Sequence, residues 1–345
     1  MHREKEIEIL QVHCQGEIGR VITGGVGDIP GRSIAEKMDY INEVDDSLRR
    51  FVTFEPRAHV AMTTNLLLPP TREDADAAFI VLQPDRAYPM SGSNCICVVT
   101  ALLESGKIRM QEPQTTVRLD TAAGIVEVTA ECRNGRCLSV TINNVPAFVE
   151  KLDAEIETAE WGKVKADIAF GGVYYAQMDV DQIGLKILPE HARALAEAGI
   201  ELVDLFNRQN KFSHPLNPSL NSLAYVMFRD YEDDGSLRTC TTLKPGRVDR
   251  SPCGTGSSAA LAIAKSRGEM KVGDSRISRS IIGGEFTAKI IGETKIGGRE
   301  AVLPQITGQA WIYGREFLRV DADDPFPTGF ALSDSWGSKV SELSK

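Results

Sequence analysis

One cysteine stands where a polar loop meets an apolar run typical of a buried helix. The loop reads Asp249-Arg250-Ser251-Pro252-Cys253-Gly254-Thr255-Gly256, and residues 259–264 are all alanine, leucine or isoleucine. A helix start leaves about four backbone N–H groups unpaired and carries a partial positive charge, which predicts a lowered pKa for Cys253. The N–H groups of Gly254 and Thr255 are suited to hold a carboxylate. A thiolate beside such a cradle can remove a proton next to a carboxylate; the alternative is a buried cysteine that only caps a core helix.

A second copy of this pattern lies 162 positions earlier in the chain. Ser91 matches Cys253, Gly92 matches Gly254, Ser93 matches Thr255, and Gly106 matches Gly268. Each copy reads as a polar loop, a helix start of small residues, a helix that is apolar on most faces, and a glycine stop. Because a helix that is apolar all round must be buried, the repeat predicts two similar domains that face each other across a cleft.

These motifs resemble the proline racemase family, whose second catalytic motif is similar to Asp249–Gly256. Further matching stretches, in colinear order from about residue 7 to 320, are His13 with Gly16-Glu17, and residues 55–59, 88–90, 120–124, 144–146 and 167–172. The family includes 4-hydroxyproline 2-epimerases and trans-3-hydroxyproline dehydratases. The resemblance implies an α/β (α+β) fold of two pseudo-symmetric domains, similar to diaminopimelate epimerase. Each domain would be a curved, mostly antiparallel sheet or barrel around a buried central helix.

The predicted domain boundary lies in a charged segment. Residues 146–165 are rich in Glu, Asp and Lys and show little apolar patterning, so the chain is expected to cross between domains there. Residues 1–155, with a C-terminal return at about 318–345, would carry Ser91. Residues 156–317 would carry Cys253. The active site is expected in the cleft between these two domains.

The resemblance also implies a role for each residue of the motifs. Cys253 would be an acid/base thiol, and Ser91 would occupy the opposing position. The substrate carboxylate would be bound by the backbone N–H groups of Gly92, Ser93, Gly254 and Thr255. These groups would stabilise the charge that develops on the carboxylate. Asp249 would contact the ring amine, or alternatively only brace the loop. No organic cofactor is implied.

One departure from the family pattern affects the expected reaction. Members that racemise or epimerise usually carry Cys-Gly-His where this chain has Ser91-Gly92-Ser93. Epimerisation needs an acid/base group on each face of Cα, and a serine hydroxyl is a much weaker acid and base than a thiol. Dehydration of trans-3-hydroxy-L-proline needs only one such group. The sequence therefore favours a dehydratase that forms an enamine and then an imine (pyrroline-2-carboxylate). A 4-hydroxyproline 2-epimerase, as main or side activity, and a non-catalytic homologue that binds proline-like amino acids are the alternatives.

The composition limits partners and compartment. The net charge of −9 argues against nucleic-acid binding, and no apolar run reaches the roughly 20 residues of a membrane span. The charged N-terminus lacks a signal-peptide core, so a cytoplasmic protein is expected, and the family implies a homodimer. Seven cysteines without a tight framework indicate reduced thiols. Asn134-Gly135 predicts a hairpin that places Cys132 opposite Cys137, where a disulfide is feasible but disfavoured by the compartment. No Cys/His spacing resembles a zinc site, so no metal is expected.

Overall fold

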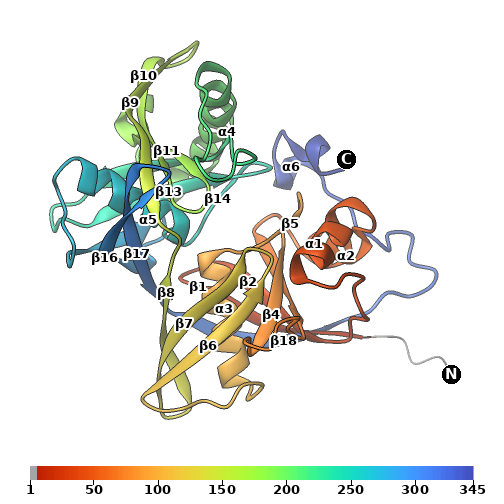
Figure 1. Ribbon diagram of the computed structural model, residues 1–345. Helices are drawn as coiled ribbons and strands as arrows, with labels where there is room; N and C mark the ends of the chain where they lie inside the picture. Colours follow the sequence, from red (N-terminus) through yellow and green to blue (C-terminus); the bar gives the residue numbers. More distant parts are fainter. Residues whose placement is uncertain (1–5, 345) are drawn as a thin grey trace. The chain divides into compact units, whose positions relative to one another are not determined.

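The computed structural model describes residues 6–344 and divides the chain into two compact units (Figure 1). Unit 1 contains the chain up to Ile142 and again from Gly308, and unit 2 is Asn143–Thr307. Both boundaries lie earlier than the predicted ones at residues 155 and 317. The cause is that the charged segment 146–165 is not a crossing but most of a β-hairpin, whose strands belong to the sheet of unit 2.

Unit 1 is a mostly antiparallel sheet with helices. Its strands are β1 (Ile7–Cys14), β2 (Glu17–Gly24), β3 (Met62–Leu68), β4 (Ala77–Leu82), β5 (Ala87–Tyr88), β6 (Gln114–Thr121), β7 (Gly124–Arg133), β8 (Arg136–Asn143) and β18 (Ala310–Leu318). Its helices are α1 (Ile34–Glu43), α2 (Ser47–Thr53), α3 (Gly92–Glu104), α6 (Ser333–Trp336) and the 3-10 helix η3 (Val340–Ser344). The strands pair in the order β18-β1-β2-β3-β4-β6-β7-β8, and only β2 with β3 and β4 with β6 run parallel.

Unit 2 repeats this order and closes it into a ring. Its strands are β9 (Ala147–Thr158), β10 (Gly162–Phe170), β11 (Tyr174–Asp179), β12 (Leu223–Tyr231), β13 (Leu237–Leu243), β14 (Arg247–Val248), β15 (Ser275–Ser280), β16 (Glu285–Ile296) and β17 (Arg299–Gly308). Its helices are α4 (Ala192–Gln209), α5 (Gly254–Ser266), and the 3-10 helices η1 (Val180–Ile183) and η2 (Pro189–His191). The pairing runs β9-β10-β11-β12-β13-β15-β16-β17 and returns to β9, with β11–β12 and β13–β15 parallel.

The two units therefore share one topology, which confirms the predicted α/β fold with two similar halves. Each has a short strand, β5 or β14, that pairs with a longer one and leads towards the central helix. Helices α3 and α5 have 13 residues each and begin one residue after Ser91 and Cys253, as the repeat predicted. Helix α3 packs on β1, β2, β3 and β18, and α5 packs on β9, β10, β11 and β16. A central helix surrounded by sheet needs apolar side chains on nearly every face, which accounts for its composition.

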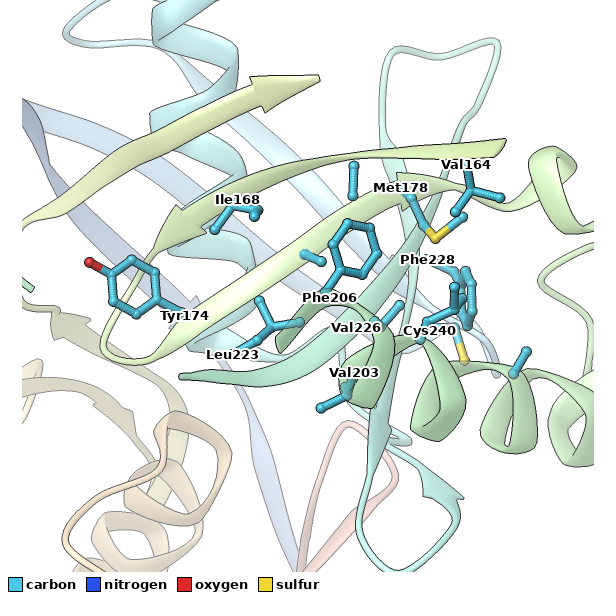
Figure 2. Close-up of a cluster of buried hydrophobic side chains, with 14 of the residues drawn as sticks. Val164, Ile168, Tyr174, Met178, Val203, Phe206, Leu223, Val226, Phe228 and Cys240 are labelled. Carbon is cyan, nitrogen blue, oxygen red and sulfur yellow. The ribbon is translucent and has the colours of Figure 1, made fainter. Parts of the chain in front are cut away.

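The main core of unit 2 lies between α4 and the sheet. Figure 2 shows Val203 and Phe206 of α4 among side chains of β11, β12 and β13, including Met178, Phe228 and Cys240. Strand β9 alternates charged side chains outward with Ala154 and Ile156 inward, both buried. That alternation is a strand pattern, and the charged outer face hid it in the sequence.

The predicted hairpin at Asn134-Gly135 is confirmed. Both residues have positive φ, 55° and 70°, and they join β7 to β8. Cys132 and Cys137 are paired in register across this hairpin, and both are buried free thiols. Among the described residues, no helix is long and apolar enough to cross a membrane.

Candidate active site

Cys253 occupies the position immediately before α5 in a backbone conformation that is unusual for a residue with a side chain. Its φ is 65° and its exposed fraction is 7%. Two neighbouring residues hold this conformation. The N–H of Cys253 donates to Ser251 Oγ at 3.2 Å, and Ser251 donates from its N–H and its Oγ to Asp249 Oδ1 at 2.8 and 2.9 Å. Strained backbone of this kind persists only where surrounding contacts fix it, and it is common at functional sites.

Tyr175 of β11 supplies a hydroxyl beside the thiol. Its oxygen lies 3.3 Å from Cys253 Sγ and 2.6 Å from Thr255 Oγ1, and the residue is 1% exposed. Two positions further along β11, Gln177 Nε2 donates to the carbonyl of Gly256 at 2.7 Å. Strand β11 thus fixes both the thiol and the first turn of α5. Tyr175 was not among the site residues predicted from the sequence. Its signal was a tyrosine three residues after the matching stretch that ends at Gly172.

Burial dominates the electrostatics of Cys253. Desolvation, with the nearby Asp249 carboxylate as the second cause, raises the pKa of the thiol to about 11. Hydrogen bonds from Tyr175, Thr241 and the Gly256 N–H act in the opposite direction and lower this pKa. The prediction of a lowered pKa was therefore wrong. The free-energy cost of burying a thiolate exceeds the stabilisation of that thiolate by the helix start and its hydrogen-bond donors. The thiol is mostly protonated at neutral pH.

Gly171 and Asn144 fit the start of α5 against its neighbours. A Cβ added at Gly171 would lie 2.2 Å from the carbonyl oxygen of Thr255 and 2.7 Å from the nitrogen of Ala259. Asn144 Nδ2 donates to the Gly171 carbonyl and to Ser258 Oγ, both at 2.9 Å. The matching stretches 144–146 and 167–172 therefore contribute close packing around α5.

Ser91 precedes α3 as Cys253 precedes α5, but in an ordinary extended conformation with φ −151°. Its hydroxyl makes no capping bond to the backbone of α3, although serine at this position usually does. Instead, Ser91 Oγ accepts a hydrogen bond from Asn94 Nδ2 at 3.0 Å and lies 3.4 Å from Ser93 Oγ. Ser91 is half-buried, whereas Ser93 and Asn94 are buried.

The remaining predicted residues lie at the two helix starts. Gly92 and Gly254 are the first residues of α3 and α5, so their N–H groups have no acceptor within the helix. Thr255 is half-buried and its hydroxyl contacts Tyr175. Asp249 is 7% exposed, and its bonds to Ser251 make it a brace of the loop. A contact of Asp249 with a ring amine stays a prediction. In residues 6–344, no group of three or more His, Cys, Asp and Glu is arranged to hold a metal ion.

The family model described as proline racemase matches residues 9–331. The chain belongs to the proline racemase family. The 4-hydroxyproline 2-epimerase of Rhizobium etli is 52% identical over 99% of this chain and 100% of that protein. The 4-hydroxyproline 2-epimerase of Agrobacterium fabrum is 50% identical over the same shares.

Solved structures agree with the family and the fold. A hydroxyproline epimerase from Agrobacterium vitis with bound trans-4-hydroxy-L-proline has 51% identity and a TM-score of 0.91, and the match covers 99% of this chain and 100% of that one. A PhzF-family phenazine biosynthesis protein from Bacillus anthracis has 13% identity and a TM-score of 0.58, and it covers 92% of this chain and 100% of its own. The second likeness concerns the fold alone.

These relatives overturn the dehydratase interpretation. Full-length relatives of 50–52% identity are epimerases of 4-hydroxyproline, the reaction kept as the alternative. The dehydratase interpretation was based on the weak acidity of an isolated serine hydroxyl. In the fold, the oxygen of Ser91 has a side-chain donor and lies at a helix start, and both lower the cost of negative charge on that oxygen.

Proposed function

We propose that this protein is a 4-hydroxyproline 2-epimerase, which inverts the configuration at C2 of 4-hydroxyproline without a cofactor. The observation that carries the proposal is the full-length similarity to epimerases of this substrate, at 50–52% identity over 99% of the chain. The likeness to a structure that holds trans-4-hydroxy-L-proline supports the same substrate class.

The proposed reaction uses one acid/base group for each face of Cα. For one epimer, the Cys253 thiolate takes the Cα proton, so a C–H bond breaks and an S–H bond forms. The Ser91 hydroxyl then gives its proton to the opposite face, so a new C–H bond forms and an alkoxide remains. The other epimer reacts in the reverse sequence. Both groups must reach one substrate molecule for this reaction.

The substrate carries groups that suit the two helix starts. Its carboxylate is proposed to accept hydrogen bonds from the N–H groups of Gly92, Ser93, Gly254 and Thr255, which stabilise charge as Cα loses its proton. Its ring ammonium is proposed to lie near Asp249. A bound cation also lowers the pKa of a neighbouring thiol, which counteracts the burial of Cys253. The substrate thereby helps to generate its own base.

The proposed cellular setting follows from the thiols. All seven cysteines are free, as is typical of a reducing compartment, so we place the enzyme in the cytoplasm. We expect a homodimer, as the family resemblance implies, and light scattering after size-exclusion chromatography measures the mass.

The test offers the purified protein trans-4-hydroxy-L-proline, L-proline and trans-3-hydroxy-L-proline in separate reactions in D₂O. We expect the C2 epimer of 4-hydroxyproline, carrying deuterium at C2, detected by chiral chromatography and proton NMR. Binding without exchange or inversion would leave only an amino-acid-binding protein and would refute the proposal. A borohydride-trapped imine from the 3-hydroxy substrate, with no epimer from the 4-hydroxy one, would also refute it.

A further inference from the structure

Two buried asparagines connect the backbone of β2 to the Ser91 hydroxyl. Asn65 of β3 donates from Nδ2 to the carbonyl oxygen of Arg20 at 3.2 Å and to Asn94 Oδ1 at 2.9 Å. Asn94 in turn donates from Nδ2 to Ser91 Oγ at 3.0 Å. The two asparagines are 0% and 3% exposed. All of these residues belong to unit 1.

This connection determines which end of the Asn94 amide faces Ser91. A backbone carbonyl can only accept, so the Asn65 atom that meets Arg20 O must be the nitrogen. The same nitrogen meets Asn94, which must therefore present its oxygen. The nitrogen of Asn94 is left to face Ser91. The Ser91 oxygen is thus an acceptor from Asn94, and its own proton is directed elsewhere.

The surroundings leave little freedom for another arrangement. A Cβ added at Gly19 of β2 would lie 2.9 Å from Asn94 Oδ1 and 2.8 Å from Cys97 Sγ, so the bare glycine lets the strand approach the amide. Asn65 Oδ1 is buried without a hydrogen-bond partner among the described residues. An unpaired buried acceptor lowers the stability of the folded state. Asn65 therefore uses both N–H groups of its amide to hold Arg20 and Asn94, and its oxygen is left unpaired within the described part of the chain.

We infer that Asn94, held by Asn65, is a positioning residue that lets Ser91 act as the acid/base group of its face. The inference rests on the proposed epimerase function. When the Ser91 O–H bond breaks and its proton forms the C–H bond at Cα, the oxygen becomes an alkoxide. The Asn94 N–H group then donates to a charged acceptor, which strengthens the bond just when the charge appears. An ordinary N-cap serine would instead receive a backbone donor.

The test separates inversion from exchange. In D₂O, Cys253 can remove the Cα proton of one epimer and return deuterium to the same face, which gives exchange without inversion. Inversion also needs Ser91. Asn94→Asp keeps the size of the side chain and an oxygen for Asn65, but replaces the donor to Ser91 with an acceptor. We expect inversion to fall at least about tenfold, as for loss of a hydrogen bond to a charged group. Exchange from one of the two epimers should stay near the wild-type rate.

A neutral variant and a matched control complete the design. Asn94→Leu also removes the donor without adding charge, and it should raise the ratio of exchange to inversion in the same way. Asn207→Asp is the control, because its amide in α4 also donates a hydrogen bond, in this case to the backbone carbonyl of Leu223 at 3.0 Å. Asn207→Asp should leave the ratio unchanged. Circular dichroism and melting temperature verify the fold of each variant.

A double substitution distinguishes positioning from a merely structural role. A thiol at position 91 depends less on an extra donor, since its thiolate forms more readily than an alkoxide. Asn94→Leu should therefore cost less inversion in the Ser91→Cys protein than in the wild type. Equal losses in both proteins, or equal losses of inversion and exchange from both epimers, would overturn the inference while wild-type epimerisation stands. A wild-type protein without epimerisation would instead refute the proposed function itself.

Discussion

The hydroxyl oxygen of Tyr175 lies 3.3 Å from Cys253 Sγ, and both side chains are buried in unit 2. Burial holds the pKa of Tyr175 well above its usual value, so the phenol remains protonated and available as a donor. The thiol is itself mostly protonated at neutral pH, but in this pair it is the group that ionises to provide a base.

Removing that donor should make the thiol harder to ionise. In Tyr175→Phe, the pKa of Cys253 rises further, and the thiolate fraction at neutral pH falls roughly tenfold, together with kcat/KM. The measurement is kcat/KM for epimerisation as a function of pH. Tyr174→Phe is the matched control, because Tyr174 donates to Glu150 at 3.1 Å instead. An unchanged pH profile in Tyr175→Phe would show that the phenol does not act on the thiol.

The wild-type pH profile carries the signature of a buried thiol. The reactive form is the thiolate, and the pKa of free Cys253 is raised to about 11, so the thiolate fraction increases throughout the neutral range. We expect kcat/KM to rise about tenfold per pH unit from about pH 6.5 to 8.5. The profile of kcat should level off at lower pH, since the bound ammonium group stabilises the thiolate. A kcat/KM profile that is already flat at pH 7 would contradict the dominance of burial.

Substitution at Ser91 should alter inversion selectively. A thiol is a stronger acid than a hydroxyl, so Ser91→Cys should invert 4-hydroxyproline about tenfold faster at neutral pH, where proton delivery by Ser91 limits the rate. Ser91→Ala should lose inversion but keep deuterium exchange from one epimer. NMR in D₂O measures both processes in one sample. Retention of full inversion in Ser91→Ala would remove Ser91 from the reaction.

Close packing at the start of α5 predicts a loss of stability. Gly171→Ala places a Cβ against backbone atoms of Thr255 and Ala259 that cannot rotate away, and should cost about 1–3 kcal/mol of unfolding free energy. Gly292→Ala is the control, since its Cβ would meet only the flexible end of Leu303, at 3.1 Å. Denaturant unfolding compares the two proteins. Equal stabilities would mean that α5 shifts freely at this point.

The local sequence pattern predicted helices α3 and α5 but not the β9–β10 hairpin. The repeat of Ser91 and Cys253 predicted where α3 and α5 begin, because both helices must be apolar and small at the same positions. Strand β9 was overlooked because its outer face is a row of charges, and only pairing with β10 and β17 shows that its inner face is buried. Contacts between distant strands depend on the tertiary fold, so they cannot be predicted from a short window of sequence.

The chemistry of the site was harder to predict than its position. Cys253 and Ser91 were found by type and spacing, yet the pKa of Cys253 was assigned the wrong direction because burial was unknown. Ser91 was judged without its donor, Asn94, although that residue lies within the same motif. The hydroxyl of Tyr175 reaches the thiol from a strand 78 positions away. In each case the chemistry of the side chain depends on surrounding groups that only the folded chain brings close to it.

The pairing of β1 with β18 also determines when the sheet of unit 1 can be completed during synthesis. Strand β1 is made first, but one of its edges has its partner only when Ala310–Leu318 has left the ribosome. In the sequence, unit 2 comes wholly between β1 and β18, so every strand of its ring is available before β18 is translated. The N-terminal sheet must therefore keep an open hydrogen-bonding edge while the inserted half completes its own, a period in which assembly with another nascent chain is the main hazard.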